Sequence, residues 1–325
     1  MNNISKIPAV SVLIPLYNTE RYIRDTIESF LNQTFQDFEI IVCDDCSADE
    51  SYEIVKSIDD SRIRLYRNEK NHGNGYTRNR LISLATGKYC AMFDCDDISY
   101  PHRLQTQYDF LESHPEIDAC TSSVDIIDEN SRKTDIIWYN EYKDSEQIKI
   151  DTLYGCAVPQ VTLFFHRQKF INKGIRYEEI GADPADDINM YKHAIFELNF
   201  SHMKDPLVAY RVWGNQYSKR APQYQRDRVA VGLEYSYSRL GLKLTQKEKG
   251  VLNLPDETTN IPDYIRTRRR LIVKVAKKNK KYNVYNQPLL KEVLLRRHRD
   301  FLRENLSKFK YKILSAEIKL IMKFI

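Results

Sequence analysis

The sequence lacks any hydrophobic run long enough to cross a membrane. No stretch approaches the roughly 18 uninterrupted apolar residues that a membrane-spanning helix needs. The N-terminal stretch MNNISKIPAVSVLIPLYN also lacks a basic segment followed by a long apolar run, so no signal peptide is evident. We therefore expect a protein that is made and kept in the cytoplasm.

The sequence also lacks a recognisable disulfide or zinc framework, because its six cysteines show no repeated spacing. Cys43 and Cys46, in the segment CDDC, have the spacing of a redox or zinc-ligand pair. No second pair and no nearby histidine completes a metal set, however. Small buried thiols are therefore the favoured interpretation.

Charge is unevenly distributed along the 325 residues, which are enough for one large α/β domain with an appendage or for two domains. Residues 266–325 contain 19 Lys/Arg and 4 Asp/Glu, a local net charge of +15, whereas the whole chain carries only +5. The segment RTRRRLIVKVAKKNKK at 266–281 has nine basic residues and no acidic one. The sequence therefore predicts a mildly acidic body and a strongly basic tail.

The body alternates between short apolar runs and amphipathic segments, which predicts a mostly parallel sheet with helical crossovers. The run AVSVLIPLY at 9–17 is typical of a strand buried on both faces. We expect the first helix to be capped at Asn18 or Thr19, and the third to stop at Gly87. The predicted strands are 9–17, 38–45, 62–68 and 88–94, and the predicted helices between them are 20–33, 47–58 and 75–87.

Two groups of aspartates follow the second and fourth predicted strands. In open sheets of this kind, ligands bind beyond the carboxyl ends of the strands. No glycine-rich loop is present to hold phosphates, since NHGNG at 71–75 is neither a P-loop nor a dinucleotide fingerprint. A divalent cation, Mn²⁺ or Mg²⁺, is the alternative that suits carboxylates. The first group is Asp44 and Asp45, and the second group is Asp94, Asp96 and Asp97. For the second group, a solvated turn without metal is the competing interpretation.

Four segments in order resemble the motifs of the family-2 glycosyltransferases, which have the GT-A fold. They are VSVLIPLYN, QTFQDFEIIVCDDCSADES, NHGNGYTRNRLISLATGKYCAMFDCDD and ADPADDINMYKHA. The resemblance covers residues 8–214 and implies an α/β GT-A fold with a basic helical C-terminal extension. It also implies a nucleotide-sugar donor, transfer with inversion at the anomeric carbon, and a role in making bacterial surface polysaccharide.

The resemblance assigns the second acidic group to the metal and the ribose. The segment DCDD stands at the position of the family's D-x-D motif, which implies Asp96 as the metal ligand. Asp97 is the alternative ligand, and Asp94 is expected closer to the ribose. Asp44 and Asp49 are instead predicted to be turn and helix-capping residues.

The resemblance also implies the residues that contact the nucleotide base. Asp45 matches the family aspartate that hydrogen-bonds uracil, which favours UDP. Pro15 and Tyr17 lie where the first loop packs against the base. Arg78 matches a basic residue near the nucleotide, although a surface salt bridge is the alternative interpretation. Cys46 departs from the family's glycine at this turn, which raises the question of its backbone conformation.

The segment DDINMY resembles the family pattern that carries the catalytic base and implies Asp187 for that role. Glycosyl transfer needs a base for the acceptor hydroxyl, and a carboxylate at the start of a helix is suited to it. Asp186 replaces the usual glutamate, and helix capping is the alternative for both. We expect Asp183 and Pro184 in a loop, and a strand over 158–170. Tyr210, Arg211 and Gln216 are candidates to contact acceptor or diphosphate.

The sequence thus predicts a metal-dependent inverting glycosyltransferase that moves a sugar from a UDP-sugar to a glycan or lipid-linked oligosaccharide acceptor. A non-catalytic protein that retains the fold and binds nucleotide-sugar or glycan is the alternative. We expect a catalytic domain over 1–220, with a nucleotide half at 8–115 and an acceptor half at 116–220. The region 221–325 is expected to be helical and basic.

The end of the tail, YKILSAEIKLIMKFI at 311–325, is an amphipathic basic segment too short to span a bilayer. It predicts binding to an anionic membrane surface, at the inner face of the cell membrane. A helix packed on the catalytic domain, or on a second subunit of a homo-oligomer, is the alternative. The tail contains no recognised nucleic-acid-binding module, so we expect no nucleic acid partner.

Overall fold

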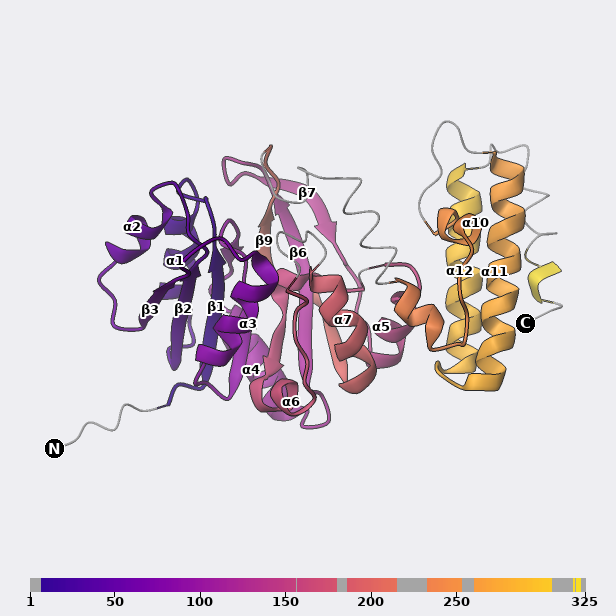
Figure 1. The fold of residues 1–325 in the computed structure, drawn as a ribbon, viewed down its shortest axis with the longest axis horizontal. Helices are drawn as coiled ribbons and strands as arrows, with labels where there is room; N and C mark the ends of the chain where they lie inside the picture. Colours follow the sequence, from indigo (N-terminus) through magenta and orange to yellow (C-terminus); the bar gives the residue numbers. More distant parts are fainter. Residues whose placement is uncertain are drawn as a thin grey trace. The chain divides into compact units, whose positions relative to one another are not determined.

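The computed structural model describes residues 7–155, 157–179, 186–214, 233–252, 260–305, 318 and 320–322. The chain divides into two compact units (Figure 1). Unit 1 comprises Met1–Ile148 and Val158–Arg228, and unit 2 comprises Lys149–Ala157 and Val229–Ile325. The expected domain boundary at residue 220 lies outside the described residues and stays a prediction.

The first part of unit 1 alternates strand and helix in the predicted order. The strands are parallel, because β1 pairs with β2 on one side and with β4 on the other, and β2 pairs with β3. Every residue of β1 is buried, as its apolar sequence predicts. The elements are β1 Val10–Leu16, α1 Ile23–Leu31, β2 Phe38–Asp44, α2 Ser51–Lys56, β3 Ile63–Arg67, α3 Asn74–Leu84 and β4 Tyr89–Met92.

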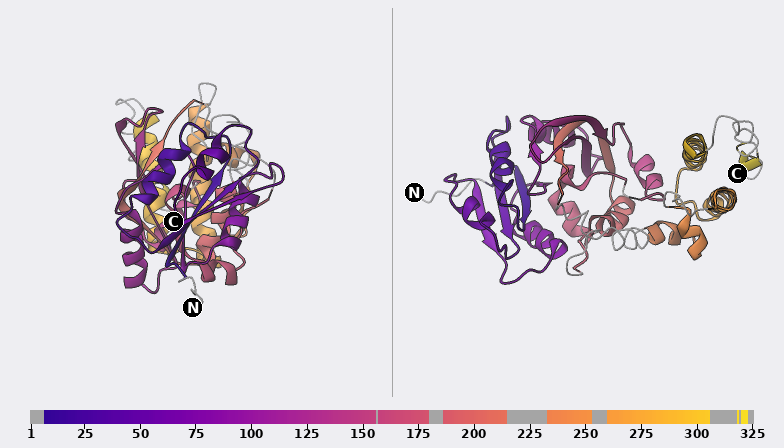
Figure 2. Two further views of the ribbon diagram at one scale, coloured as in Figure 1. Left: turned by 90° about the vertical axis from the view of Figure 1, so that its left-hand side faces the viewer. Right: turned by 90° about the horizontal axis from the view of Figure 1, so that it is seen from above.

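The second part of unit 1 adds strands of mixed direction to the same sheet. The nine-stranded sheet has the order β3-β2-β1-β4-β8-β6-β9-β5, with β7 paired to β6. Figure 2 gives two further views of this arrangement. The elements are β5 Ile98–Ser99, α4 Arg103–Ser113, β6 Ala119–Ile127, β7 Lys133–Trp138, α5 Ser145–Asp151, the 3-10 turn Gln160–Thr162, β8 Phe164–His166, α6 Arg167–Asn172, α7 Asp186–Glu197 and β9 Phe200–Arg211.

The strand order has a switch point at β1: the chain goes outward from β1 to β2 and β3, and then crosses to β4, which pairs with the other side of β1. The carboxyl ends of β1, β2 and β4 therefore meet at one edge of the sheet, where α/β proteins bind ligands. Both predicted acidic groups follow strands that end at this edge.

Three local predictions were wrong. The first helix begins at Ile23 with Tyr22 at its cap and no side-chain cap, rather than at Asn18 or Thr19. Gly87 does not end α3, which stops at Leu84. A Cβ at Gly87 would lie 2.7 Å from the backbone nitrogen of Ser11, so the glycine allows a close approach to β1. The strand expected over 158–170 is only three residues long.

Unit 2 contains α10 Gln246–Gly250, α11 Ile261–Tyr282 and α12 Gln287–Asn305. Figure 1 draws α11 and α12 side by side, and they pack against each other. Asn279 of α11 stabilises their connection, because its Oδ1 accepts the backbone N–H groups of Val284 and Tyr285 and its Nδ2 donates to the carbonyl of Tyr285. The buried residues of the two helices include Leu271, Val275, Leu290 and Val293.

Among the described residues, no helix is both long and apolar enough to cross a bilayer. The amphipathic segment predicted over 311–325 lies mostly outside the described residues.

Candidate active site

The acidic turn Asp94–Asp97 follows β4 directly and is fixed by the first helix. The hydroxyl of Thr26, on α1, donates to the backbone carbonyls of Cys95 at 3.1 Å and Asp97 at 2.8 Å. Thr26 itself is completely buried. The hydroxyl of Thr26 on α1 therefore holds the backbone of the turn in place at the carboxyl edge of the sheet.

The carboxylates of this turn have different surroundings. Asp96 is partly buried, and its Oδ2 accepts the indole N–H of Trp213 at 2.7 Å. Burial raises the pKa of Asp96 to about 6, and the neighbouring Asp94 acts in the same direction. Asp97 is completely buried, and its Oδ1 accepts the backbone N–H of Arg211 at 2.7 Å. Burial also raises the pKa of Asp97 well above its usual value.

Arg78 joins the acidic turn to helix α7. Its Nη2 donates to Oδ1 of Asp94 at 2.8 Å, and its Nη1 donates to Oδ2 of Asp186 at 2.6 Å. The guanidinium also lies 5.4 Å from the ring centre of Tyr177. Because the Arg78 side chain is only 6% exposed, the alternative of a surface salt bridge is wrong. Arg78 instead links the acidic turn after β4 to α7, the helix with the predicted base, through its ion pairs with Asp94 and Asp186.

Asp187 lies beside Asp186 in the first turn of α7, with its Oδ1 accepting the backbone N–H of Ile188 at 2.8 Å. Burial and the neighbouring Asp186 raise the pKa of Asp187 to about 7, while Arg78 opposes the rise. A carboxyl group with a pKa near neutrality can accept a proton at physiological pH. Such a group is chemically suited to general base catalysis.

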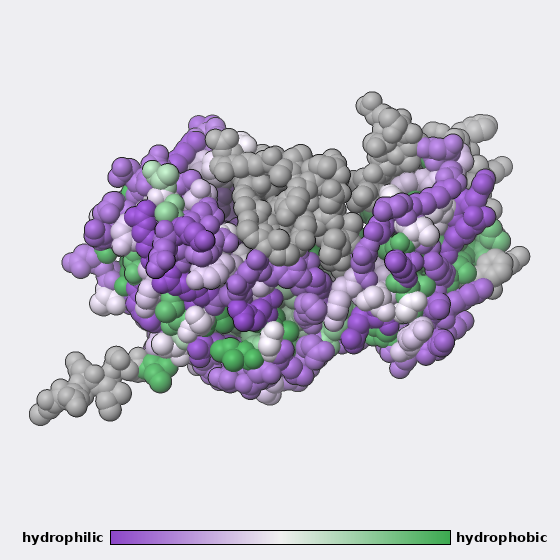
Figure 3. Space-filling model, viewed as in Figure 1, coloured by the Kyte–Doolittle hydropathy of each residue, from purple (hydrophilic) through white to green (hydrophobic). Residues whose placement is uncertain are grey.

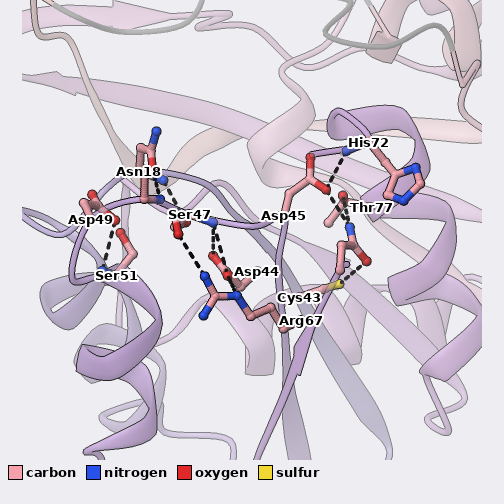
Figure 4. A network of polar contacts seen from close by, with 12 residues as sticks. Asn18, Cys43, Asp44, Asp45, Ser47, Asp49, Ser51, Arg67, His72 and Thr77 are labelled. Atoms are coloured by element: carbon pink, nitrogen blue, oxygen red, sulfur yellow. Dashed lines mark hydrogen bonds and ion pairs between the residues drawn. The ribbon is translucent and has the colours of Figure 1, made fainter. Parts of the chain in front are cut away.

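Asp45 is at the centre of a cradle formed by the loop before α3 (Figure 4). Its Oδ1 accepts the side-chain amide of Asn68 at 2.6 Å and the backbone N–H of His72 at 2.9 Å, and its Oδ2 accepts the backbone N–H of Gly73 at 2.7 Å. The Asn68 amide also donates to Thr77 at 3.0 Å. The buried carboxylate therefore fixes the loop at 68–73, whatever else it binds.

Asp44 has the turn role predicted for it, whereas the N-cap of α2 is Glu50 and not Asp49 as predicted (Figure 4). The carboxylate of Asp44, completely buried, accepts the backbone N–H of Ser47 at 3.2 Å and pairs with Arg67 at 3.1 Å. Asp49 accepts the backbone N–H of Ser51 at 3.0 Å, at the start of α2. Between them, Cys46 has a φ of 65°, a left-handed conformation that costs a non-glycine residue about 1–2 kcal/mol. The turn therefore keeps the conformation that the family's glycine would favour.

The other candidate residues differ in how far they are exposed to solvent. Pro15 is buried within β1, and Tyr17 is 38% exposed just after that strand. Arg211 is completely buried, and its side chain donates to the backbone carbonyl of Asp96 at 2.7 Å. Tyr210 is partly buried beside it. Asp183, Pro184 and Gln216 lie outside the described residues.

Sequence reasoning missed three side chains that shape this site, namely Asn68, Thr77 and Trp213. Asn68 and Thr77 act through the cradle of Asp45, and Trp213 acts through Asp96. Asn68 and Trp213 lie outside the four segments that resemble the family, and Thr77 lies inside the third one but was not singled out there.

Comparison with known proteins defines the family. The sequence model of glycosyl transferase family 2 matches residues 11–173, which is half of the chain. The chain belongs to glycosyl transferase family 2. The family region thus contains the acidic turn, the Asp45 cradle and Arg78, whereas α7 and β9 follow it.

Curated glycosyltransferases match parts of the chain. It is 43% identical over 127 residues to an uncharacterized glycosyltransferase of Methanocaldococcus jannaschii, covering 38% of this chain and 44% of that protein. It is 38% identical over 104 residues to the UDP-Glc:alpha-D-GlcNAc-diphosphoundecaprenol beta-1,3-glucosyltransferase WfaP of Escherichia coli, covering 32% of this chain and 41% of WfaP. The chain thus spans less than half the length of these two proteins.

Among solved structures, residues 1–349 of S. aureus TarS in complex with UDP-GlcNAc resemble the protein. The TM-score is 0.59 at 20% sequence identity, and the likeness covers 90% of this chain and 89% of the TarS chain. This likeness confirms the predicted fold class, a GT-A fold with helices at the C-terminal end.

Proposed function

We propose that the protein is a cation-dependent, inverting glycosyltransferase that moves a sugar from a UDP-sugar to a glycan or lipid-linked glycan. One observation supports this most directly: Arg78 joins the acidic turn at the end of β4 to the first turn of α7. The residues assigned to the donor and the residue assigned to the base are thereby held on two sides of one ionic cluster.

The residues present fit a divalent cation shared with a nucleoside diphosphate. Within the described part of the chain, no group of three or more His, Cys, Asp or Glu side chains is arranged to hold a metal by itself. Mg²⁺ in nucleotide enzymes is commonly held by one or two carboxylates together with substrate phosphates. Asp96, which is partly buried, and Asp94 can serve in this way, whereas Asp97 is enclosed and bonded to Arg211. We therefore assign the cation, Mn²⁺ or Mg²⁺, to Asp96.

The cradle and the loop after β1 are assigned to the uridine. Asp45 accepts three hydrogen bonds in its loop, and a carboxylate has about four acceptor sites, so one remains for the N–H of a uracil ring. Tyr17 is exposed at the same edge of the sheet and can pack on the base. UDP-Glc in the name of WfaP and UDP-GlcNAc bound to TarS support UDP as the nucleotide.

The reaction proposed is one in-line displacement. The acceptor hydroxyl oxygen forms a bond to the anomeric carbon while the bond from that carbon to the diphosphate oxygen breaks, which inverts the configuration. Asp187 takes the hydroxyl proton on the face opposite the leaving group. The cation, when bound, supplies positive charge for the departing diphosphate. The diphosphoundecaprenol-linked substrate named for WfaP supports a lipid-linked acceptor here.

A thermal-shift panel tests the donor assignment. Because a ligand that binds only the folded state raises the melting temperature, UDP-sugars should raise it more with Mn²⁺ than without. Sugars linked to adenosine diphosphate should have less effect, because the six-membered ring of adenine has no N–H to donate to Asp45. A shift that is equal for all nucleotides, or one that ignores Mn²⁺, would contradict the proposal.

We further propose that unit 2 binds an anionic membrane surface, where a lipid-linked acceptor would lie. Hydrophilic side chains cover much of the visible surface over α11 and α12 (Figure 3). Basic residues near an anionic membrane contribute about 1 kcal/mol each, so several of them give measurable binding. Five exposed cations on α11 are suited to this role, namely Arg266, Arg270, Lys277, Lys280 and Lys281.

The membrane proposal predicts that the 325-residue chain sediments with anionic vesicles, that neutral vesicles leave it in solution, and that high salt releases it. Replacing the five α11 cations by glutamine should lower partitioning at least about tenfold, since a loss of about 1.4 kcal/mol already has that effect. UDP binding by unit 1 should not change.

A variant with five exposed cations of unit 1 changed to glutamine is the matched control and should still sediment. Equal partitioning of the α11 variant and the control, or of the wild type to both vesicle types, would contradict the proposal. The control positions are Arg24, Lys56, Lys133, Arg176 and Lys204.

A further inference from the structure

Trp213 makes a direct hydrogen bond to the carboxylate assigned to the cation. Its indole N–H donates to Oδ2 of Asp96 at 2.7 Å, a short and well-formed bond. Trp213 follows β9 by two residues and is one of only two tryptophans in the chain, the other being Trp138. A tryptophan side chain is a hydrogen-bond donor only, so this contact places a fixed donor against one carboxylate oxygen.

The indole ring is itself held in place by its neighbours. It meets the ring of Tyr22 edge to face, with ring centres 5.2 Å apart and planes at 66°. Tyr22 is 3% exposed and also lies under the guanidinium of Arg211, at 4.4 Å from its ring centre. Because Trp213 rests on a buried ring, its N–H is pre-oriented toward Asp96 and is not a mobile surface donor.

The end of β9 holds the acidic turn through three donors altogether. The backbone N–H of Arg211 binds Oδ1 of Asp97, and the Nε of Arg211 binds the backbone carbonyl of Asp96, both at 2.7 Å. Arg211 therefore fixes the backbone of the turn, and Trp213 fixes the side chain of Asp96. The indole N–H occupies one lone pair of Oδ2, so Oδ1 is the oxygen that this donor leaves more open to a cation.

We propose that Trp213 is a positioning residue that holds the carboxylate of Asp96 ready to bind the cation. The proposal rests on the proposed function, in which Asp96 is the cation ligand. Partners that hydrogen-bond to ligating carboxylates orient them, and losing such a partner typically lowers metal affinity about 10- to 100-fold. The β9 segment thereby sets the affinity of the site for its cation without contacting the cation itself.

A Trp213→Phe variant tests this, because phenylalanine keeps a ring against Tyr22 but has no N–H. Titration of Mn²⁺ in the presence of saturating UDP, by calorimetry or by the paramagnetic resonance signal of free Mn²⁺, should show affinity about 10- to 100-fold weaker than in the wild type. UDP binding without cation and the melting temperature should stay close to the wild-type values. Trp138→Phe is the matched control and should bind Mn²⁺ normally, since Trp138 is an exposed residue on β7.

The Trp138→Phe control also provides a second readout that does not depend on the folding of the Trp213 variant. Trp213 is then the sole tryptophan, and paramagnetic Mn²⁺ bound at Asp96 should quench its emission, whereas Mg²⁺ should not. The quenching midpoint should match the calorimetric affinity. A Trp213→Phe affinity equal to or tighter than wild type would overturn the inference while leaving the cation assignment in place. Mn²⁺ binding without quenching would place the cation away from Asp96 and overturn both. If the wild type binds no cation with UDP, the cation assignment fails, and this inference fails with it.

Discussion

An Asp187→Asn variant should bind UDP-sugar almost normally and lose turnover by about 100-fold or more. Asparagine keeps the shape of the side chain and can still accept the N–H of Ile188 through its carbonyl oxygen. It cannot take a proton from an acceptor hydroxyl. Release of UDP, measured against a panel of glycan and lipid-linked acceptors, reports turnover, and calorimetry with UDP-sugar reports binding.

The pH dependence of the wild type gives the same assignment a second test. Burial and Asp186 raise the pKa of Asp187 to about 7, and only the deprotonated carboxylate can act as a base. Activity should therefore rise as the pH increases from about 6 to about 8, and then level off. In the Asp187→Asn variant, the residual activity should lack this rise.

Asp205→Asn is the matched control, since it removes an exposed carboxylate on β9 and should keep full activity. Near-normal turnover in Asp187→Asn would move the role of base to Asp186 or Asp183. Asp186 is the weaker candidate, because its carboxylate is only 4% exposed and is bonded to Arg78.

The first strands and helices could be predicted because each carries its signal locally. The run from Val10 to Leu16 is apolar at nearly every position, which is what burial on both faces of a parallel sheet requires. The segment 158–170 looked similar but contains a 3-10 turn, a three-residue strand and the start of a helix. An apolar run records that a segment is buried, and it does not record whether a neighbouring strand is available to pair with it.

Gly87 shows the same limit for a single residue. Its position after an amphipathic segment is typical of a helix stop, but its structural role is a close approach to Ser11, which lies 76 residues away. Local sequence cannot distinguish these two uses of glycine, because both depend on the missing Cβ.

The site was predictable as far as it depends on strand ends. The carboxyl ends of parallel strands meet at one edge, so the aspartates after β2 and β4 could be placed there from the sequence. The bonds from Arg78 to Asp186 and from Trp213 to Asp96 join residues 108 and 117 positions apart. Such pairs are brought together only by the complete fold, and nothing in either local segment indicates them.

An Asp96→Ala variant should lose the part of UDP binding that depends on Mn²⁺ while remaining folded. Alanine removes the carboxylate that we assign to the cation. It should cost little stability, because burial already disfavours the charged form of this group and raises its pKa. Calorimetry of UDP with and without Mn²⁺ should therefore give the same weak affinity in the variant, at the level of the wild type without metal.

An Asp97→Asn variant is the matched control, because asparagine can still accept the N–H of Arg211, and it should keep the response to Mn²⁺. The opposite result would be undiminished Mn²⁺-dependent binding in Asp96→Ala and a loss of it in Asp97→Asn. Asp97 would then be the ligand, and the turn would have to open, because the carboxyl group of Asp97 is completely buried.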